Sequence, residues 1–215
     1  MAETGAETLA ERLRGPFRDA AEAVFLHGST PWEVDEAVEA FGFTEGPFAA
    51  EDRIGLDLAW QRQGPDGGPI LGRMMELGKL GRMAGAGWYR YPGGGGKVDD
   101  PIVADLALEE AHFHRMTRVA YSEEEIRARL LTALVVAAVE LRGQGFAEAE
   151  IDRVSVAALG FPADKGGVLV WARAMGAARL GAMIGPVRDE GRVPLRPSRW
   201  LDDGRWLDDG CWPAG

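Results

Sequence analysis

Apolar residues recur along the first part of the chain at the spacing of an amphipathic helix. This period predicts a helix over residues 7–27 that bends at Gly15-Pro16, because proline removes one backbone donor and clashes with the preceding turn. The positions that carry the period are Leu9, Leu13, Phe17, Ala20 and Val24. The sequence after it contains a capping box, in which Thr30 and Glu33 flank a helix start at Pro31 that continues to Gly42.

The remainder of the chain also reads as helical. A Gly/Pro-rich connection runs from residue 42 to 57 and includes a short helical turn, and a second capping box, Ser122 with Glu125, opens a long apolar helix. No segment alternates between apolar and polar residues at period two, so the sequence predicts an all-α fold. The later helices are expected at residues 69–82, 101–120, 123–142, 147–158 and 168–184.

An internal repeat at an offset of 117 residues relates two parts of the chain. The matched positions are Arg12-Leu13 with Arg129-Leu130, Gly28 with Gly145, Asp35 with Asp152, Gly42-Phe43 with Gly160-Phe161, and Gly46 with Gly166. The repeat predicts two pseudo-repeated helical halves that pack about a pseudo-twofold axis. Chance similarity between two amphipathic helix pairs is the alternative, although amphipathicity alone does not require matched glycines.

The repeat and the glycine content suggest a division of the chain. We expect a first helical half at 1–63, a Gly-rich linker region with one helix at 64–101, a second helical half at 102–185 and a Trp-rich tail at 186–215. Three aromatic residues are expected to pin the long glycine-rich loop, namely Trp88, Tyr89 and Tyr91.

Composition and charge restrict the function. The chain has 24 Lys plus Arg against 34 Asp plus Glu, a net charge of −10, which disfavours nucleic acid as a partner. A single cysteine, Cys211, leaves no internal disulfide framework. The acidic N-terminus lacks the pattern of an export signal, and the most apolar run, 130–139, is half the length of a membrane span. We therefore expect a cytoplasmic protein that does not bind membranes.

Three motifs carry a family resemblance. They are GFTEGPF at 42–48, LGRMAGAGWYRY at 80–91 and GFPADKGGVLVW at 160–171, and the likeness extends from about Leu9 to about Gly181. The chain resembles the C-terminal region of 3-hydroxyacyl-CoA dehydrogenases, in particular the tandem C-terminal domains of the fatty-acid oxidation complex alpha subunit. This resemblance implies a 6-phosphogluconate dehydrogenase C-terminal-like fold and a role in fatty-acid β-oxidation.

The family's reaction, as the resemblance implies it, oxidises an L-3-hydroxyacyl-CoA and passes hydride to NAD. NAD binds to an N-terminal Rossmann domain through a G-x-G-x-x-G turn. No such fingerprint occurs here: GAGWYR at 85–90 lacks the third glycine, and GGGGK at 93–97 is followed by Val98 where a phosphate-binding loop has Ser or Thr. The chain alone is therefore expected to bind no cofactor, and NAD only through a partner domain.

The family's catalytic positions are altered or missing in this sequence. Its base, a histidine oriented by a glutamate, lies upstream of the region present, and its asparagine before the helix arginine is Glu11 here. An Asn-Glu pair of the long helix corresponds to Val136-Ala137, and an Asp that often follows the tryptophan corresponds to Arg173. We therefore assign no catalytic residue. The candidates for lining a substrate groove are Glu11, Arg12, Pro47 and Phe48.

Other reactive residues suggest packing or solvated positions. His27 fits a helix C-terminus, and His112 and His114 point in different directions on a helix, so no metal site is expected. The acidic pairs at 99–100, 202–203 and 208–209 are interpreted as solvated turns. The tail repeats RWLDDG and places tryptophans at 200, 206 and 212, which suits a bound tail or a partner-binding strip.

Two functional hypotheses follow. The first is a C-terminal subunit or domain of a 3-hydroxyacyl-CoA dehydrogenase, which forms a homodimer or joins a Rossmann-domain chain and shares in binding acyl-CoA. The second is a non-catalytic helical scaffold derived from that family. The dimer is expected because apolar residues surround the long helix, among them Leu130, Leu134, Val135, Val136, Val139 and Leu141. An independent enzyme has no residue set to support it.

Overall fold

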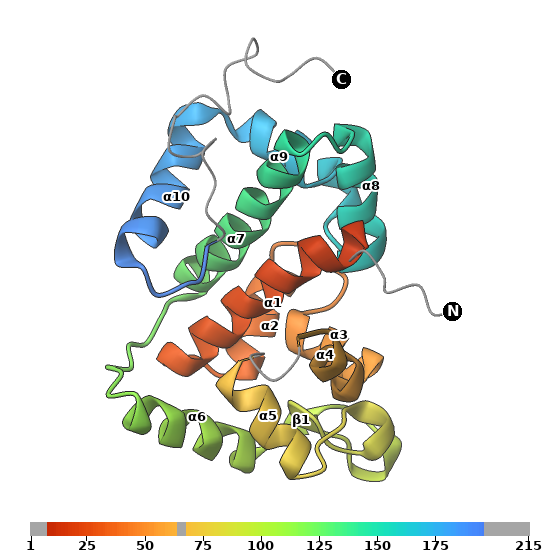
Figure 1. Cartoon of the computed structure of the whole chain (residues 1–215), viewed down its shortest axis with the longest axis vertical. Coiled ribbons are helices and arrows are strands. Elements are labelled where there is room, and N and C mark those ends of the chain that lie inside the picture. The colour runs from red at the N-terminus through yellow and green to blue at the C-terminus, as the bar shows by residue number, and fades with distance from the viewer. Residues whose placement is uncertain (1–7, 64–67, 196–215) are drawn as a thin grey trace. The chain divides into compact units, whose positions relative to one another are not determined.

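The computed structural model describes residues 8–63 and 68–195, and over these ranges it confirms the all-α prediction (Figure 1). The chain divides into two compact units. Unit 1 consists of Met1–Ala20, Phe41–Thr44 and Ala128–Gly215, and unit 2 consists of Ala21–Ala40 and Glu45–Arg127. Neither unit is a continuous stretch of sequence. The proposed division at residues 63, 101 and 185 stays a prediction.

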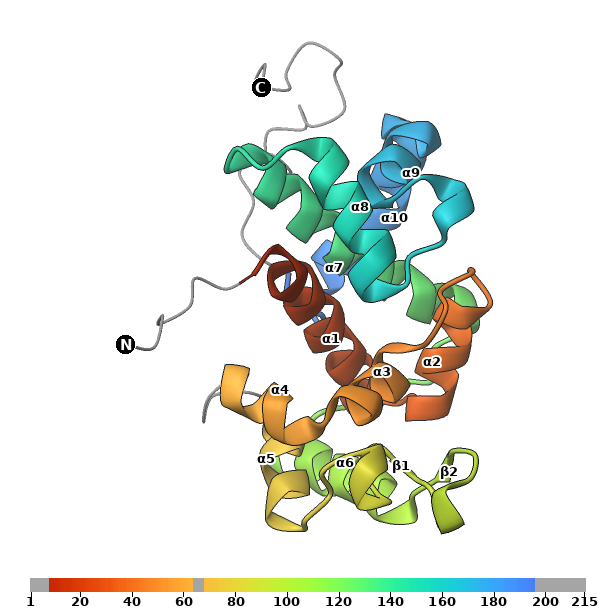
Figure 2. The ribbon, with the colours of Figure 1, turned by 90° about the vertical axis from the view of Figure 1, so that its right-hand side faces the viewer.

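Unit 2 contains the second part of α1 and a series of short helices around a small hairpin. The hairpin is antiparallel and pairs Tyr89 with Asp99 and Arg90 with Val98 (Figure 2). The core of unit 2 contains an aromatic cluster. In this cluster, the ring centroid of Trp88 lies 4.4 Å from that of Phe48 and 5.7 Å from that of Phe25. The elements are α1 (Leu9–His27), α2 (Pro31–Glu39), α3 (Pro47–Ile54), α4 (Leu56–Gln63), α5 (Pro69–Glu76), η1 (Arg82–Ala84), β1 (Tyr89–Arg90), η2 (Pro92–Gly94), β2 (Val98–Asp99) and α6 (Pro101–Phe113).

Unit 1 packs the first part of α1 and the loop 41–44 with the C-terminal helices. Phe43 of the loop stacks on Phe17 at 5.2 Å and meets Phe161 edge-on at 5.4 Å. These ring contacts explain why four residues of the α2–α3 connection belong to unit 1. The elements are α7 (Glu123–Gly143), α8 (Glu148–Leu159), η3 (Ala163–Lys165), α9 (Val168–Met175) and α10 (Ala177–Glu190).

The long apolar helix α7 is buried by its own chain. Each residue on which the dimer expectation was based is at most 3% exposed. These side chains therefore do not offer a free surface to a second copy. The homodimer stays a prediction, but the apolar side chains of α7 no longer support it.

Both predicted capping boxes are present. The Thr30 hydroxyl accepts the Glu33 N–H at 3.1 Å, and the Glu33 carboxylate accepts the Thr30 N–H at 2.7 Å. Ser122 and Glu125 repeat the arrangement at 3.3 and 2.8 Å. Helix α1 passes through Pro16 as one helix. The caps satisfy backbone donors that no helical carbonyl reaches, so each helix start is encoded within four residues.

Helix ends depart from the predictions in four places, the first of which is α2, which ends at Glu39 and not at Gly42. Helix α5 stops at Glu76, where Gly78 has φ +70° and the Lys79 N–H bonds to Met74 in a Schellman motif. Helix α6 stops at Phe113 in the same motif, with Arg115 at φ +53° in place of glycine. The expected helix 168–184 is two helices, α9 and α10, which meet at Gly176 with a bend of 107°.

The repeat has a structural counterpart in two buried aspartates. Asp35 of α2 accepts the N–H groups of Phe48 and Ala49 at the start of α3, each at 3.0 Å. Asp152 of α8 accepts those of Leu169 and Val170 at the start of α9, at 2.6 and 3.4 Å. Each aspartate thus fixes the next helix by its N-terminus.

One matched pair of the repeat is corrected by one residue. A Cβ on Gly46 would overlap the Asp35 carboxyl group, and a Cβ on Gly167 would overlap that of Asp152. Gly46 therefore corresponds to Gly167, which directly precedes α9, and Gly166 ends η3. The pseudo-twofold packing of the halves stays a prediction.

The segment 64–101 contributes buried residues to unit 2 over its described part. Trp88, Tyr89 and Tyr91 are at most 6% exposed, which confirms that they pin the glycine-rich loop. The segment contains α5 and the hairpin. In the described ranges no single helix is long and apolar enough to span a membrane, and only the bent pair α9 and α10 passes that test jointly.

Alanine at the two glycines that precede the repeated helices should destabilise the chain. Gly46 has φ −73°, so Gly46→Ala adds no backbone strain and displaces the Asp35 carboxylate from its N–H donors. Because hydrogen bonds to a charged group contribute about 1.5–3 kcal/mol each, we expect a loss of about 2 kcal/mol or more in the free energy of unfolding. Gly167→Ala, at φ +112°, adds about 1–3 kcal/mol of strain. Urea denaturation measures both.

The matched control is Gly181→Ala in the interior of α10, where a Cβ meets nothing within 4 Å. Alanine there should raise the free energy of unfolding by about 0.5–1 kcal/mol, because it restricts the unfolded chain. A Gly46→Ala variant as stable as the unsubstituted chain would contradict the steric argument.

Candidate functional site

The two candidates on α1 lie in unit 1 and are engaged with neighbouring side chains. Glu11 pairs with Arg14, whose guanidinium also donates to the Ala158 carbonyl at 2.9 Å. Arg12 donates to the Gln144 side-chain oxygen and its guanidinium lies 5.1 Å from the centre of the Phe146 ring. These contacts join the start of α1 to the C-terminal helices within unit 1. A role for Glu11 and Arg12 in substrate binding stays a prediction.

The two candidates on α3 lie in unit 2 and are buried. Phe48 is fully buried and packs on Trp88 and Phe25, and Pro47 occupies the first position of the helix. Proline suits that position because its missing N–H would have no helical partner. Both residues thus have a structural role, and their contribution to a substrate groove stays a prediction.

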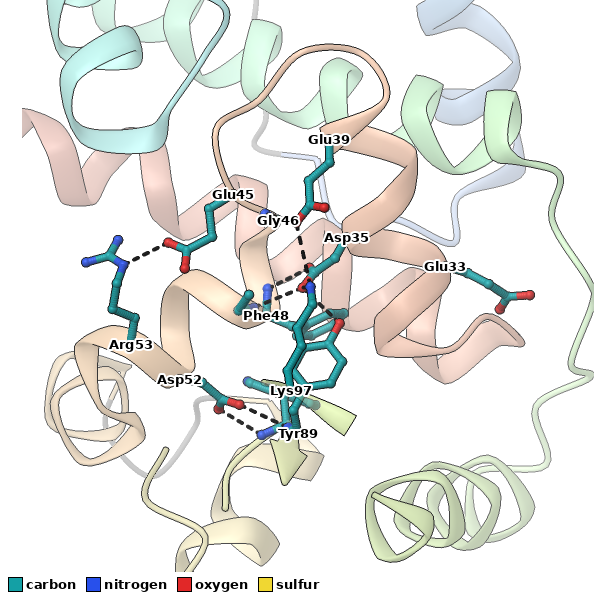
Figure 3. A network of polar contacts seen from close by, with 12 residues as sticks. Glu33, Asp35, Glu39, Glu45, Gly46, Phe48, Asp52, Arg53, Tyr89 and Lys97 are labelled. Carbon is teal, nitrogen blue, oxygen red and sulfur yellow. Dashed lines mark hydrogen bonds and ion pairs between the residues drawn. The ribbon is translucent and has the colours of Figure 1, made fainter. Parts of the chain in front are cut away.

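A network of buried carboxylates organises unit 2 (Figure 3). Asp35 receives the two N–H groups of α3, a hydrogen bond of 2.8 Å from the Tyr89 hydroxyl and the Lys97 ammonium at 3.4 Å. Asp35 is fully buried. Three neutral donors and one cation thus surround a single carboxylate.

Asp52 forms the second centre of this network. It accepts the N–H groups of Trp88 and Tyr89 at 2.8 and 2.9 Å and the Tyr91 hydroxyl at 2.9 Å. A Cβ on Gly87 would overlap the Asp52 carboxylate, so only glycine fits there. The glycine-rich string GAGWYR therefore presents its amides to an internal carboxylate, which occupies donors that a nucleotide phosphate would use.

Further buried polar groups complete the network. Glu51 accepts the Trp88 indole N–H at 2.7 Å. Lys79 and Asp100 form an ion pair whose side chains are 7% and 1% exposed. Asp100 also caps α6 by accepting the Ile102 N–H at 3.0 Å. The expected solvated acidic pair at 99–100 is thus wrong for Asp100, and right for the exposed Asp99.

Burial shifts the acid–base behaviour of the network. It raises the pKa of Asp35 and of Asp52 to about 6, since removal from water disfavours the charged form more than the hydrogen bonds favour it. Burial and the neighbouring carboxylates raise the pKa of Tyr89 and Tyr91 above the ordinary value. A tyrosine hydroxyl can accept as well as donate, so each aspartate can take up a proton and keep this contact.

The histidines occupy the predicted kinds of position. His27 ends α1 with its Nδ1 2.8 Å from the Ala23 carbonyl, and His112 and His114 are exposed at the end of α6. No group of three or more His, Cys, Asp or Glu within residues 8–63 and 68–195 is placed to hold a metal ion. The acidic pairs 202–203 and 208–209, the tryptophan repeat and Cys211 lie outside the described residues.

Comparison with known proteins relates the chain to a family of dehydrogenase domains. The sequence profile of "3-hydroxyacyl-CoA dehydrogenase, C-terminal domain" matches residues 9–91, which include Asp35, Asp52 and the aromatic loop. Residues 9–91 belong to this dehydrogenase C-terminal domain family. Peroxisomal bifunctional enzymes of Pongo abelii and Homo sapiens are 32% and 31% identical to it over 189 residues. The match covers 77% of this chain and 26% of each relative, so the chain spans about a quarter of their length.

Solved structures agree in fold. The dehydrogenase part of multifunctional enzyme 1 from C. elegans aligns with a TM-score of 0.61 and 19% identity, over 83% of this chain and 44% of that one. The 3-hydroxybutyryl-CoA dehydrogenase from Escherichia coli K12 aligns with a TM-score of 0.67 and 16% identity, over 93% and 59%. At these identities the likeness shows the fold alone.

The residues that depart from the family pattern are buried or paired in this dehydrogenase C-terminal domain. Val136 and Ala137 are buried in α7 and at most 2% exposed. Arg173 on α9 pairs with Glu148 of α8 at 2.7 Å. The burial and the partners of Asp52 and Glu51 could not be predicted from the sequence, because these partners lie 36 or more residues away.

The stability of this domain should fall as the pH rises from about 4 to about 6. The folded chain binds protons at Asp35 and Asp52 more tightly than the unfolded chain, because the folded pKa of each is raised from 3.8 to about 6. Stability is therefore lost with rising pH until both folded groups are ionised. The free energy of unfolding of the unsubstituted chain exceeds that of Asp52→Asn by an amount that should shrink by about 2 kcal/mol between pH 4 and pH 6.

Urea denaturation at several pH values measures this difference. Asp105→Asn, on the exposed face of α6, removes the same charge and controls for the overall charge of the chain. An advantage of the wild type that stays level or grows between pH 4 and 6 would show that burial does not raise the pKa of Asp52.

Proposed function

We propose that the chain is the C-terminal helical part of a 3-hydroxyacyl-CoA dehydrogenase of fatty-acid β-oxidation, with a platform role in assembly and in forming the acyl-CoA groove. The family match carries this proposal. In it, NAD and the histidine–glutamate base come from a Rossmann domain, whose G-x-G-x-x-G fingerprint these 215 residues do not contain. The partner is that domain or a second copy of the chain.

The assignment of the base and the NAD site to another domain follows from the chemistry of the reaction. Hydride transfer from the 3-hydroxyl carbon requires a base for the hydroxyl proton and a cradle for the NAD pyrophosphate. In the described part of the chain, the acids of the network accept hydrogen bonds from backbone amides, tyrosines and an indole. The pair of His114 and Glu110, 3.5 Å apart, is on the surface, where the histidine side chain is 51% exposed. Neither arrangement prepares a base beside a bound cofactor.

A non-catalytic scaffold is the second candidate. Glu11 in place of the family's asparagine favours it, because a carboxylate accepts hydrogen bonds and repels a developing oxyanion. The buried Val136 and Ala137 in place of an Asn-Glu pair favour it as well. Such a scaffold would keep the helical fold and bind a partner without contributing to the reaction.

The cellular compartment is a separate prediction. The cytoplasm is the location expected from the sequence and stays a prediction. The relatives from orang-utan, human and guinea pig are named as peroxisomal enzymes, and one from Brassica napus as a glyoxysomal protein.

The purified chain alone should neither bind NAD nor oxidise 3-hydroxybutyryl-CoA, because the phosphate cradle and the base are both missing from it. Adding a Rossmann domain of a 3-hydroxyacyl-CoA dehydrogenase should restore NADH formation if the chain completes the enzyme. Calorimetry measures NAD binding, and absorbance measures NADH.

Light scattering of the same samples reports whether a dimer or a complex forms, so that a failed assembly is distinguished from an inactive one. Micromolar NAD binding by the isolated chain would overturn the division of labour. A stable complex without activity would leave the scaffold as the function.

Glu11→Asn should raise the rate of the assembled enzyme if the chain takes part in catalysis. An amide restores a donor to the developing oxyanion, and one such donor contributes a factor of roughly 100–1000 in rate, of which we expect a fraction to be recovered. Steady-state NADH formation from 3-hydroxybutyryl-CoA with matched partner concentrations measures the effect.

Glu124→Asn in the first turn of α7 is the control, because it removes the same charge from an exposed position. Glu11→Asn also removes the contact with Arg14, which costs about 0.5 kcal/mol of stability at most. Equal rates for Glu11→Asn, Glu124→Asn and the unsubstituted chain would exclude a catalytic contribution from position 11.

A further inference from the structure

The ammonium group of Lys97 lies in a cage of two aromatic rings and two carboxylates. Its Nζ is 4.8 Å from the centre of the Tyr89 ring and 5.1 Å from that of the Trp32 ring. The same atom is 3.4 Å from the Asp35 carboxylate and 3.6 Å from that of Glu39 (Figure 3). Aromatic faces and carboxylates both attract a cation, so all four walls suit one.

The walls of the cage are fixed by contacts that do not involve Lys97. Tyr89 is fully buried and its hydroxyl is bonded to Asp35, which is itself held by the two N–H groups of α3. The Trp32 and Tyr89 rings stand at 82° to each other with 5.9 Å between their centres. Glu39 accepts the Gly46 N–H at 3.0 Å. The cage is therefore preformed around the ammonium position.

Lys97 is attached to a glycine-rich backbone. It follows four exposed glycines, Gly93–Gly96, of which Gly93 and Gly94 have φ of +62° and +74°. A Cβ on Gly93, Gly94 or Gly96 would meet nothing within 4 Å, so close packing does not restrict this loop. The Lys97 side chain remains 23% exposed. The cation can thus leave the cage by motion of the loop, while the walls stay in place.

We propose that Trp32, Asp35, Glu39 and Tyr89 form a binding site for alkylammonium cations, which Lys97 occupies from within the chain. A primary or methylated ammonium ion from solution takes this position when the lysine side chain leaves it. A tethered group competes as if present at millimolar concentration, so the open site is best detected when the lysine is removed.

Chemical rescue tests the proposal. Lys97→Ala deletes the cation together with three methylene groups, which correspond to n-propylammonium, and should lower the melting temperature. Propylammonium or tetramethylammonium chloride should raise it again in a saturable way, by about 3–6 °C at ten times the dissociation constant. Sodium chloride at equal ionic strength is the salt control and should not reproduce the shift.

Two variants show where the cation binds. Lys97→Met loses the same charge but keeps an unbranched apolar side chain in the place of the lysine stem, so the ammonium ions should produce no saturable shift. Trp32→Ala in the Lys97→Ala background removes one wall and should abolish the rescue. Equal shifts in Lys97→Ala and Lys97→Met, or no shift at about 50 mM ligand, would overturn the proposal.

A measurement on the unsubstituted sequence does not depend on the folding of these variants. Reductive methylation with ¹³C-formaldehyde converts accessible lysines to dimethylammonium groups, and the chain has three lysines. The Lys97 signal, identified by its absence in Lys97→Arg, should move upfield because of the two rings. A Lys97 signal at the position of free dimethyllysine would show that the cage does not hold a methylated ammonium ion and would overturn the proposal.

Discussion

Buried aspartates that bind pairs of backbone N–H groups are the interaction on which both units of this chain depend. Asp35 and Asp152 each accept the first N–H groups of a following helix, and Asp52 does the same for the aromatic loop. These amides have no partner within their own element, and a helix N-terminus carries partial positive charge. A carboxylate satisfies two of them at once. Because each carboxylate is buried, displacing it from its N–H donors is costly. Glycine is therefore required where the backbone passes directly beside a carboxylate.

That requirement gives the internal repeat its physical meaning. Gly46 and Gly167 are matched because a side chain at either would occupy the space of the aspartate carboxylate. Gly87 has the same relation to Asp52. The repeat thus conserves within one chain a unit of helix, aspartate, glycine and helix. The flanking residues differ freely, since they pack in different surroundings in the two units.

The polar residues of this dehydrogenase C-terminal domain serve its architecture more than its chemistry. Within the described residues, the buried acids are committed to amides, hydroxyls, an indole and two lysines, and the family's asparagine position is Glu11. Each of the three lysines in a chain rich in arginine has a defined contact, Lys79 with Asp100, Lys97 in its cage and Lys165 4.9 Å over Phe41. In the proposed function, the redox chemistry depends on groups contributed by a Rossmann domain.

The sequence by itself determined the helical class and both capping boxes, because each depends on residues within a few positions of one another. The burial of the aromatic loop could be expected from its three large aromatic side chains, although their partners could not. It also revealed the family through ordered motifs. The early end of α6 could not be read from it, since Arg115 stands where such ends have glycine. Nor could the partners of Asp52, because Trp88 is 36 residues away and nothing local favours that pairing. Only the tertiary structure decided which acids are buried and what they bind, since burial and pairing of charge depend on segments that folding brings together from distant parts of the chain.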